Sequence, residues 1–290
     1  MKNSNIIKSF IFLAITFLVY AVKLQADSFI QPIHSFNEVN FNDIQPNTLV
    51  VFDVDDTLIQ PIDSYVFNEH SAQGKTFRNK LIQEHPEVQN WDELSAIVLQ
   101  EAERPLIEPI IIQKVHELKQ RGIPVIACTG MNTGPHGPLP SLEEWRYEHL
   151  KSLGFQGSYD NLIFKNKGFK RNPGFYKGVL STDLEDKGPI LMVFLDQLNL
   201  KPKVIEMFDD HLPYLESVQK ECKKQGISFH GYHYKNSRSI PWDEALIQFQ
   251  ADYLIKHKEW LSDEEGRHLM ACFLKVNHQK FEALKQAEWK

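Results

Sequence analysis

The chain has 290 residues, of which 42% are hydrophobic and 24% are charged, an ordinary globular composition with enough apolar material for a core. This length suits one domain with an insertion, or one domain and a second small one. The formal net charge of -6 argues against nonspecific binding to nucleic acid. Cys128, Cys222 and Cys272 are odd in number and scattered, which excludes a disulfide framework, and their neighbours suggest buried positions.

The N-terminus has the pattern of a secretory signal peptide. Two lysines precede an uncharged run over residues 9–22, and Ala26 offers a small residue for cleavage. We therefore expect a signal peptide over residues 1–26 and a mature chain over residues 27–290, with 29 basic and 38 acidic residues and a formal charge of -9. The alternative is an uncleaved membrane anchor, although the run is shorter than the roughly 20 residues that span a bilayer. The expected location is the periplasm or the exterior of a bacterial cell, free of the membrane after cleavage.

The first strongly apolar run ends in three carboxylates. Residues 27–48 have no clear period and are expected to wrap the domain edge, whereas residues 49–52 predict a strand buried on both faces of a parallel sheet. Asp53, Asp55 and Asp56 follow. Because unpaired carboxylates are unfavourable inside a buried strand, they are expected just past its carboxyl end, where open α/β sheets bind ligands. Clustered carboxylates repel unless a cation lies among them, so the pattern favours a divalent metal with oxygen ligands.

The next segments predict an insertion and then a return to the sheet. Residues 59–105 are mixed and polar, with one helix expected over residues 73–83 and another capped by Asn90, which together predict a small helical insertion. An amphipathic helix starting at Pro109 then leads into an apolar strand over residues 124–128. A helix followed by a strand at this spacing predicts a right-handed βαβ crossover.

Thr129 and Gly130 end that second strand and open a long irregular stretch. Residues 131–186 are expected to form a loop, a helix that a capping box starts at Ser141, and a hairpin or second small insertion. Within the loop, His136 could touch a substrate, although an exposed loop histidine is usually only solvated. An apolar triplet over residues 162–164 predicts a third strand in this stretch.

Another apolar strand ends in paired acids. Residues 203–208 lead into Asp209 and Asp210, and helix capping is the alternative role for either side chain. A fifth strand is expected over residues 227–232. Residues 243–290 are predicted to be helical, and their amphipathic faces indicate packing against the domain rather than a separate module.

Four segments between residues 49 and 232 resemble, in order, the four motifs of the haloacid dehalogenase (HAD) superfamily. They are Asp-Val-Asp-Asp-Thr at residues 53–57, Thr129-Gly130, Lys187 before an apolar helix, and Asp209-Asp210. Lys167 and Lys177 are alternatives for the lysine. The resemblance implies a Rossmann-like α/β core, with a mainly parallel sheet flanked by helices, in which residues 59–105 form a small helical cap. More narrowly, the chain resembles a little-characterised family of secreted bacterial HAD-like proteins.

The resemblance also implies a phosphomonoester hydrolase, because an Asp two positions after the first marks phosphatases and phosphotransferases in this superfamily. Asp53 would attack phosphorus and form an aspartyl-phosphate, and Asp55 would act as general acid and then as general base. The cofactor would be Mg²⁺, and the remaining implied roles are phosphate binding by Thr129, Gly130 and Lys187, and metal binding by Asp53, the backbone carbonyl of Asp55, Asp209 and Asp210, the last directly or through water.

The expected partner is a small phosphorylated substrate, with specificity set by the cap and by residues 131–186. Two other hypotheses stay open. One is a catalytically idle scaffold that binds a partner or a phosphorylated ligand. The other is a membrane-anchored structural protein, which depends on the signal remaining uncleaved.

Overall fold

The computed structural model describes residues 28–273 except residues 161 and 237. The signal peptide expected over residues 1–26 lies outside this part of the chain, as does the end of the predicted C-terminal helices from residue 274 onward. Within the described ranges, no helix combines the length and the apolar character needed to cross a membrane.

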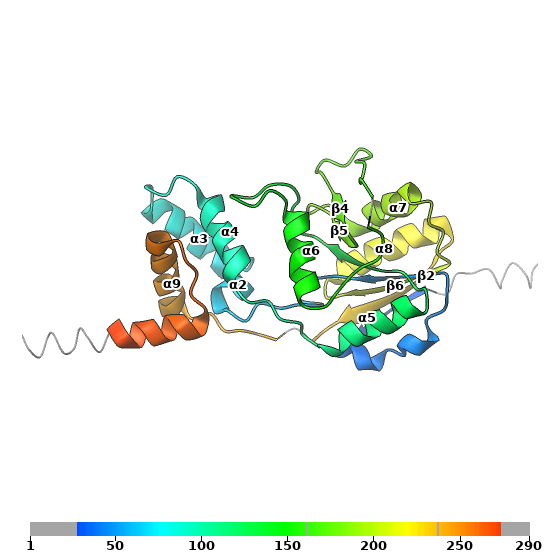
Figure 1. Cartoon of the computed structure of the whole chain (residues 1–290), viewed down its shortest axis with the longest axis horizontal. Coiled ribbons are helices and arrows are strands. Elements are labelled where there is room, and N and C mark those ends of the chain that lie inside the picture. Colours follow the sequence, from blue (N-terminus) through cyan, green and yellow to red (C-terminus); the bar gives the residue numbers. More distant parts are fainter. Residues whose placement is uncertain (1–27, 161, 237, 274–290) are drawn as a thin grey trace, which may run out of the picture.

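The chain forms an α/β structure around a seven-stranded, mostly parallel sheet (Figure 1). Its strand order is β1-β7-β6-β2-β3-β5-β4, and the β4–β5 pair is antiparallel whereas the other neighbours run parallel. The predicted fold class, a mainly parallel sheet flanked by helices, is therefore confirmed. The strands are β1 (Ser28–Ile33), β2 (Thr48–Phe52), β3 (Val125–Thr129), β4 (Gly174–Tyr176), β5 (Val179–Ser181), β6 (Val204–Asp209) and β7 (Ser228–Tyr234).

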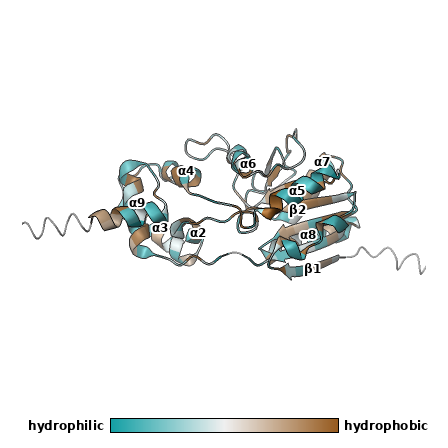
Figure 2. Cartoon of the chain, turned by 60° about the horizontal axis from the view of Figure 1, so that its bottom comes forward, coloured by the Kyte–Doolittle hydropathy of each residue, from teal (hydrophilic) through white to brown (hydrophobic). Residues whose placement is uncertain are grey.

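Helices cover both faces of the sheet. Since side chains alternate along a strand, β2 sends Val50 and Phe52 into one apolar cluster and Leu49 and Val51 into another. The first cluster includes residues of η1, η2, α5 and α6, and the second includes residues of α7 and α8. In Figure 2 the hydrophobic colour accordingly follows the strands between these layers. The covering elements are η1 (Phe36–Glu38), η2 (Phe41–Asp43), α5 (Ile110–Gln120), α6 (Leu142–Ser152), α7 (Lys187–Gln197) and α8 (Leu212–Gln225).

Local sequence signals set the ends of several helices. Proline lies in the first turn of α8, where its missing N–H leaves no hydrogen bond unmade, and Gly226 ends this helix with a left-handed φ of 70°. Ser141 caps α6 by accepting a hydrogen bond from the N–H of Glu144, which is one of the two bonds of the predicted capping box, whereas the Glu144 side chain accepts from the hydroxyl of Tyr176. Asn90 caps α4 in the same manner, through the N–H of Glu93.

A second group of helices lies to one side of the sheet (Figures 1 and 2), and we call it the helical unit. It contains α2 (Ser64–Asn68), α3 (Ala72–Glu84), α4 (Trp91–Glu101), α9 (Glu244–His257) and the helical residues 263–273. Leu254 and Trp260 pack with Val66 and Leu94, so the segment from residue 243 is packed on the helices of the predicted 59–105 insertion. The sequence had indicated packing against the domain in general, because amphipathic faces do not specify their partner.

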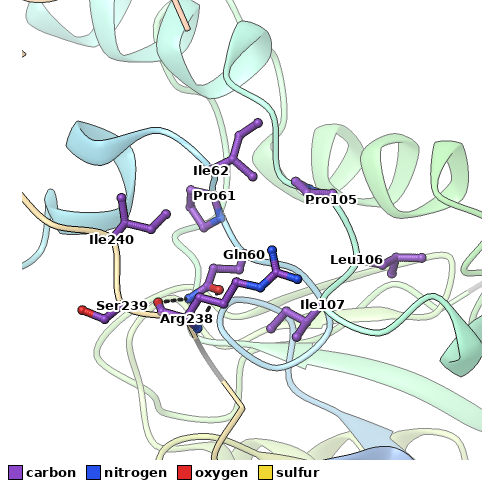
Figure 3. A pocket seen from close by; sticks show the side chains of 9 residues that line it. All are labelled: Gln60, Pro61, Ile62, Pro105, Leu106, Ile107, Arg238, Ser239 and Ile240. Carbon is purple, nitrogen blue, oxygen red and sulfur yellow. Dashed lines mark hydrogen bonds between the residues drawn. The ribbon is translucent and has the colours of Figure 1, made fainter. Parts of the chain in front are cut away.

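Three connections join the helical unit to the sheet, and they are held to one another by hydrogen bonds. The side-chain amide of Gln60 donates to the carbonyl of Arg238 at 2.9 Å and accepts from its N–H at 2.9 Å. The N–H of Gln60 donates to the carbonyl of Pro105 at 3.1 Å. A pocket of about 230 Å³ lies between these segments, lined by residues 60–62, 105–107 and 238–240 (Figure 3).

Three local predictions differ from the structure. Residues 28–33, expected to wrap the edge, form β1, whose mixed polarity reflects its place at the sheet edge. The triplet at residues 162–164 is not a strand, and Ile163 is 84% exposed; the hairpin β4–β5 supplies the strands of this region. Cys272 is exposed rather than buried, whereas Cys128 and Cys222 are buried as expected.

Candidate functional site

Several of the predicted site residues meet at the point of the sheet where the strand order reverses. β2 lies between β3 and β6, so the strand order reverses beside β2, and such switch points form the ligand crevices of open α/β sheets. Asp53 follows β2 directly, and its N–H donates to the carbonyl of Phe208 at 2.8 Å. Asp209 is the last residue of β6. The two carboxylates are therefore fixed by neighbouring strands rather than by a flexible loop.

Lys187 joins these two carboxylates from the first turn of α7. Its ammonium Nζ lies 2.5 Å from Asp53 Oδ1 and 2.7 Å from Asp209 Oδ2, and its side chain is fully buried. Burial alone would lower the pKa of Lys187, but the charges of Asp209 and Asp53 outweigh it and raise that pKa. The alternative lysines lie elsewhere: Lys167 pairs with Asp196, and Lys177 lies over Tyr147 and Tyr176.

Asp210 completes a group of three carboxylates. Asp53, Asp209 and Asp210 each offer one oxygen, and these oxygens all lie within 4.8 Å of one another. Hydrogen bonds hold Asp209 and Asp210 in place. The N–H of His211 donates to Asp209 Oδ1 at 2.8 Å, and the N–H of Asp210 donates to Thr57 Oγ1 at 3.0 Å. We call these three residues the acid group.

The acid group carries more negative charge than Lys187 neutralises. Burial raises the pKa of Asp53 to about 7, with Lys187 opposing this rise and Asp209 adding to it. Burial together with the charges of Asp53 and Asp209 raises the pKa of Asp210 to about 8. At neutral pH the group therefore binds protons that isolated carboxyl groups would have released, and a cation would displace them.

The donor set fits a hard divalent cation. All three side chains offer carboxylate oxygen, the ligand type that Mg²⁺ prefers, and the ammonium of Lys187, which contacts Asp53 and Asp209, supplies one positive charge against three carboxyl groups. The side chain of Asp55 is not among these donors, because both of its oxygens accept from Arg146 at 2.9 and 3.1 Å. The contribution expected from the backbone carbonyl of Asp55 stays a prediction.

Asp55 points toward α6 and β3. In addition to its two contacts with Arg146, its Oδ2 accepts a hydrogen bond from Thr129 Oγ1 at 3.4 Å. Sequence reasoning missed Arg146, which is 3% exposed. A signal was present: Arg146 lies four residues after Leu142 and four before Leu150, both buried, so it falls on the inward stripe of its helix.

Gly130 and His136, also singled out in the sequence, have different neighbours. Gly130 follows Thr129 at the end of β3, and a Cβ added to it would lie 3.3 Å from the hydroxyl of Tyr214, whose ring also faces the ammonium of Lys187 at 4.7 Å. His136 instead contacts the helical unit, because its Nε2 lies 2.7 Å from Ser95 Oγ on α4.

The raised carboxyl pKa values predict how stability depends on pH without metal. In the unfolded chain Asp53 and Asp210 have pKa values of about 4. In the folded chain these pKa values are raised to about 7 for Asp53 and about 8 for Asp210. The unfolded state therefore binds fewer protons across this interval, so the free energy of unfolding falls as pH rises from about 4 to about 8. Added Mg²⁺ should raise the melting temperature more at pH 8 than at pH 5.

Differential scanning calorimetry with EDTA and with Mg²⁺ measures this dependence. Asp210→Asn removes one titrating carboxyl and should flatten both the fall with pH and the extra gain from Mg²⁺ at pH 8. A metal-free melting temperature that stays constant or rises between pH 4 and pH 8 would contradict this account of the acid group.

The chain is similar to several rickettsial proteins, each described as uncharacterized. One from Rickettsia bellii is 26% identical over 250 residues, which cover 80% of this chain and 85% of that protein. One from Rickettsia prowazekii is 28% identical over 248 residues, covering 80% and 82%. One from Rickettsia conorii is 31% identical over 135 residues, covering 43% and 46%. No solved structure matches the chain.

A family comparison covers most of the molecule. The family described as "Protein of unknown function (DUF2608)" matches residues 32–267. The matched span begins within β1 and ends at residue 267, in the helical residues after α9, so it takes in the acid group, Lys187, Arg146 and helices α2, α3, α4 and α9 of the helical unit. The chain belongs to the DUF2608 family.

Proposed function

We propose that the protein is a Mg²⁺-dependent phosphomonoester hydrolase of the HAD superfamily that acts through an aspartyl-phosphate on Asp53. One observation carries this proposal: Asp53, two residues before Asp55, lies beside Lys187, Asp209 and Asp210 at the switch point of a mostly parallel sheet. Such a site offers a nucleophile, a proton donor and compensating positive charge, the three things that cleavage of a phosphate ester needs.

In the first step the carboxylate of Asp53 attacks phosphorus. A bond forms between phosphorus and an Asp53 oxygen, and the bond between phosphorus and the leaving oxygen breaks. Asp55 gives its proton to that leaving oxygen, so that an alcohol departs. Lys187 holds Asp53 in place through its 2.5 Å contact and offers positive charge to the phosphoryl oxygens.

In the second step water attacks the same phosphorus atom. Asp55, now a carboxylate, takes a proton from this water, the bond to Asp53 breaks, and inorganic phosphate leaves. Thr129 is placed to orient Asp55, because its hydroxyl lies 3.4 Å from Asp55 Oδ2. Mg²⁺, held by the acid group, would neutralise charge on the phosphoryl oxygens and screen the carboxylates from one another.

The helical unit is the cap in this proposal. Its α4 meets α6 through an apolar cluster that contains Ala96 and Leu142, with Leu99 and Trp145 packed against it. α6 also supplies Arg146, the partner of Asp55, so contact with the unit reaches the proposed proton donor. We further propose that the protein is exported and acts on a small phosphorylated substrate outside the cytoplasm, which rests on the N-terminal sequence pattern alone.

Release of phosphate from p-nitrophenyl phosphate tests the proposal, measured with Mg²⁺ and with excess EDTA. We expect turnover with Mg²⁺ and its loss in EDTA, restored by added Mg²⁺. Turnover that is unchanged in EDTA would contradict the metal-dependent mechanism. A folded protein that binds Mg²⁺ and phosphate esters but releases no phosphate from a panel of small esters would instead favour the idle scaffold.

A further inference from the structure

Two arginines are buried where the helical unit meets α6. Arg104 follows α4 and is 7% exposed, and Arg146 belongs to α6 and is 3% exposed. Arginine is rarely buried unless its guanidinium is paired. Both guanidinium groups lie near Trp145, with their central carbons 6.0 and 4.9 Å from the ring centroid. The junction therefore concentrates positive charge beside the proposed catalytic loop.

The hydrogen bonds of Arg146 are incomplete. Its Nη2 donates to both oxygens of Asp55, at 2.9 and 3.1 Å. Its Nε and Nη1 are buried and have no hydrogen-bond partner among the described residues. Of the five N–H groups on a guanidinium, the one on Nε and the two on Nη1 are thus unused. Because a buried charged donor without a partner is costly, such an arrangement calls for an acceptor.

Arg104 has its own contacts and does not supply that acceptor. Its Nη1 donates to the carbonyls of Leu99 and Ala102, both at 2.9 Å. Burial lowers the pKa of Arg104, and the charge of Arg146 lowers it further, so the two cations repel each other. The acids that act on Arg104 are Asp55, Glu69 and Asp63.

His149, one turn beyond Arg146, is not a negatively charged partner for Arg146 either. Burial, followed by the charges of Arg146 and Arg104, lowers the pKa of His149 to about 4, so its ring is neutral at physiological pH. Its Nδ1 is also buried without a hydrogen-bond partner in the described part of the chain. The neighbourhood thus combines two arginines, a neutral histidine and Asp55. Its unused hydrogen-bonding groups include the Nε and Nη1 donors of the Arg146 guanidinium.

We infer that Arg146, supported by Arg104, binds a second anionic group on the substrate, so that the preferred substrates are small phosphate esters with a carboxylate or second phosphate on the leaving group. The inference rests on the proposed function. Asp55 faces the leaving oxygen in that mechanism, and Arg146 contacts Asp55, so the rest of the leaving group lies toward Arg146. A guanidinium matches the two oxygens of such an anion with parallel N–H donors.

This arrangement gives Arg146 two states. In the structure its Nη2 holds Asp55, its Nε and Nη1 are buried, and its neighbour Trp145 packs against the apolar cluster that joins α4 to α6. A small displacement of the helical unit from α6 would open the side of Arg146 that carries the unused donors. The incoming anion would then bind there and draw the guanidinium away from Asp55, which leaves that carboxyl group free to contact the leaving oxygen.

Equilibrium binding tests the inference without requiring turnover. The protein is the full chain with Asp53→Asn, in excess Mg²⁺, and the method is titration calorimetry. The probes are matched pairs: ethyl, propyl and butyl phosphate against the phosphates in which the terminal methyl group is a carboxylate. We expect at least one carboxylate to bind about tenfold or more tightly than its alkyl partner, the effect of a charge-assisted hydrogen-bond pair.

Variants in the same background assign this preference. The measure is the dissociation constant of the alkyl phosphate divided by that of its carboxylate partner. Arg146→Gln should reduce this ratio to about one, and Arg104→Gln should also reduce it. Arg146→Lys keeps the positive charge and should retain part of the preference for the carboxylate. Lys151→Gln is the matched control, because Lys151 lies on the same helix but is exposed and pairs with Glu148. It should leave the ratio unchanged. Circular dichroism confirms that each variant is folded.

The outcomes separate the two proposals. Alkyl phosphates that bind, without any advantage for a carboxylate of any length, overturn the second-anion inference and leave the proposed function intact. A carboxylate advantage that survives both Arg146→Gln and Arg146→Lys overturns the assignment to Arg146. If the Asp53→Asn protein binds Mg²⁺, as a separate titration with the metal alone shows, but binds no phosphate ester of either kind, the proposed function fails and this inference fails with it.

Discussion

Replacing Asp53 with Asn should abolish phosphate release while leaving the fold intact. Asn has nearly the same shape as Asp and can keep the place of Asp53 beside Lys187, but a neutral amide cannot attack phosphorus. We expect kcat for p-nitrophenyl phosphate to fall by about 10⁴-fold or more, as when other enzymes lose their nucleophile. Initial rates at saturating Mg²⁺, with circular dichroism as a check of folding, measure this effect.

Asp56→Asn is the matched control for that experiment. Asp56 lies in the same loop with a left-handed φ of 62°, which Asn adopts readily, and its carboxylate accepts from the side chain of Gln60 at 3.2 Å. It is not one of the acid group. Its replacement should therefore lower kcat far less than Asp53→Asn does. Equal losses in the two variants would show that the roles assigned within this loop are wrong.

Lys187→Met should destabilise the protein strongly when metal is absent. The substitution keeps a long side chain but leaves Asp53 and Asp209 facing each other without the ammonium that now lies 2.5 and 2.7 Å from them. Removing one partner from a buried ion pair generally lowers the free energy of unfolding by about 3–5 kcal/mol. Urea denaturation in EDTA measures this change, and added Mg²⁺ should restore part of the loss because it neutralises the same carboxylates.

Lys167→Met controls for loss of a lysine that makes an ion pair at the surface. Lys167 contacts Asp196 at 2.5 Å, yet both side chains are more than half exposed, so this pair should contribute little to the free energy of unfolding. If Lys187→Met unfolds at the same urea concentration as Lys167→Met in EDTA, Lys187 is not the cation that balances the acid group.

The sequence predicts the strands at the centre of the sheet well, because strands buried on both faces have mostly apolar residues. β2 and β3 are apolar before their last residues except for Thr48, and β6 is likewise apolar except for the buried Glu206, a composition typical of strands in a sheet covered on both faces. The same physics predicts the position of Asp53, Asp209 and Thr129, since a carboxylate or hydroxyl after such a run must lie at its carboxyl end. The structure brings Asp53, Asp209, Asp210 and Lys187 together, and Thr129 contacts Asp55.

The edges of the sheet are less predictable. β1 carries exposed polar residues because it has a neighbour on one side only, and β4 and β5 are three residues long, so neither produces a pattern. The triplet around Ile163 was apolar enough to imitate a strand, although Ile163 itself is exposed and its two neighbours are only partly buried. An apolar run reports hydrophobicity, but pairing partners decide whether it joins a sheet.

Long-range partners also escape sequence reasoning. The packing of α9 on α2, α3 and α4 joins segments far apart in the chain, and amphipathic faces on each side do not identify one another. Arg146 was missed for a related reason: its position on the buried stripe of α6 marks it as unusual, but its partner Asp55 lies 91 residues away. Only the fold shows that the two meet.

Trapping of the phosphorylated protein tests the central claim most directly. The protein is mixed with Mg²⁺ and a ³²P-labelled phosphomonoester, quenched in acid within milliseconds, and digested to locate the label. We predict a substoichiometric label that is stable in acid, is released by hydroxylamine as an acyl phosphate should be, and maps to the peptide that contains Asp53. Turnover with no label on the protein, or a label that persists in Asp53→Asn, would contradict an aspartyl-phosphate at this position.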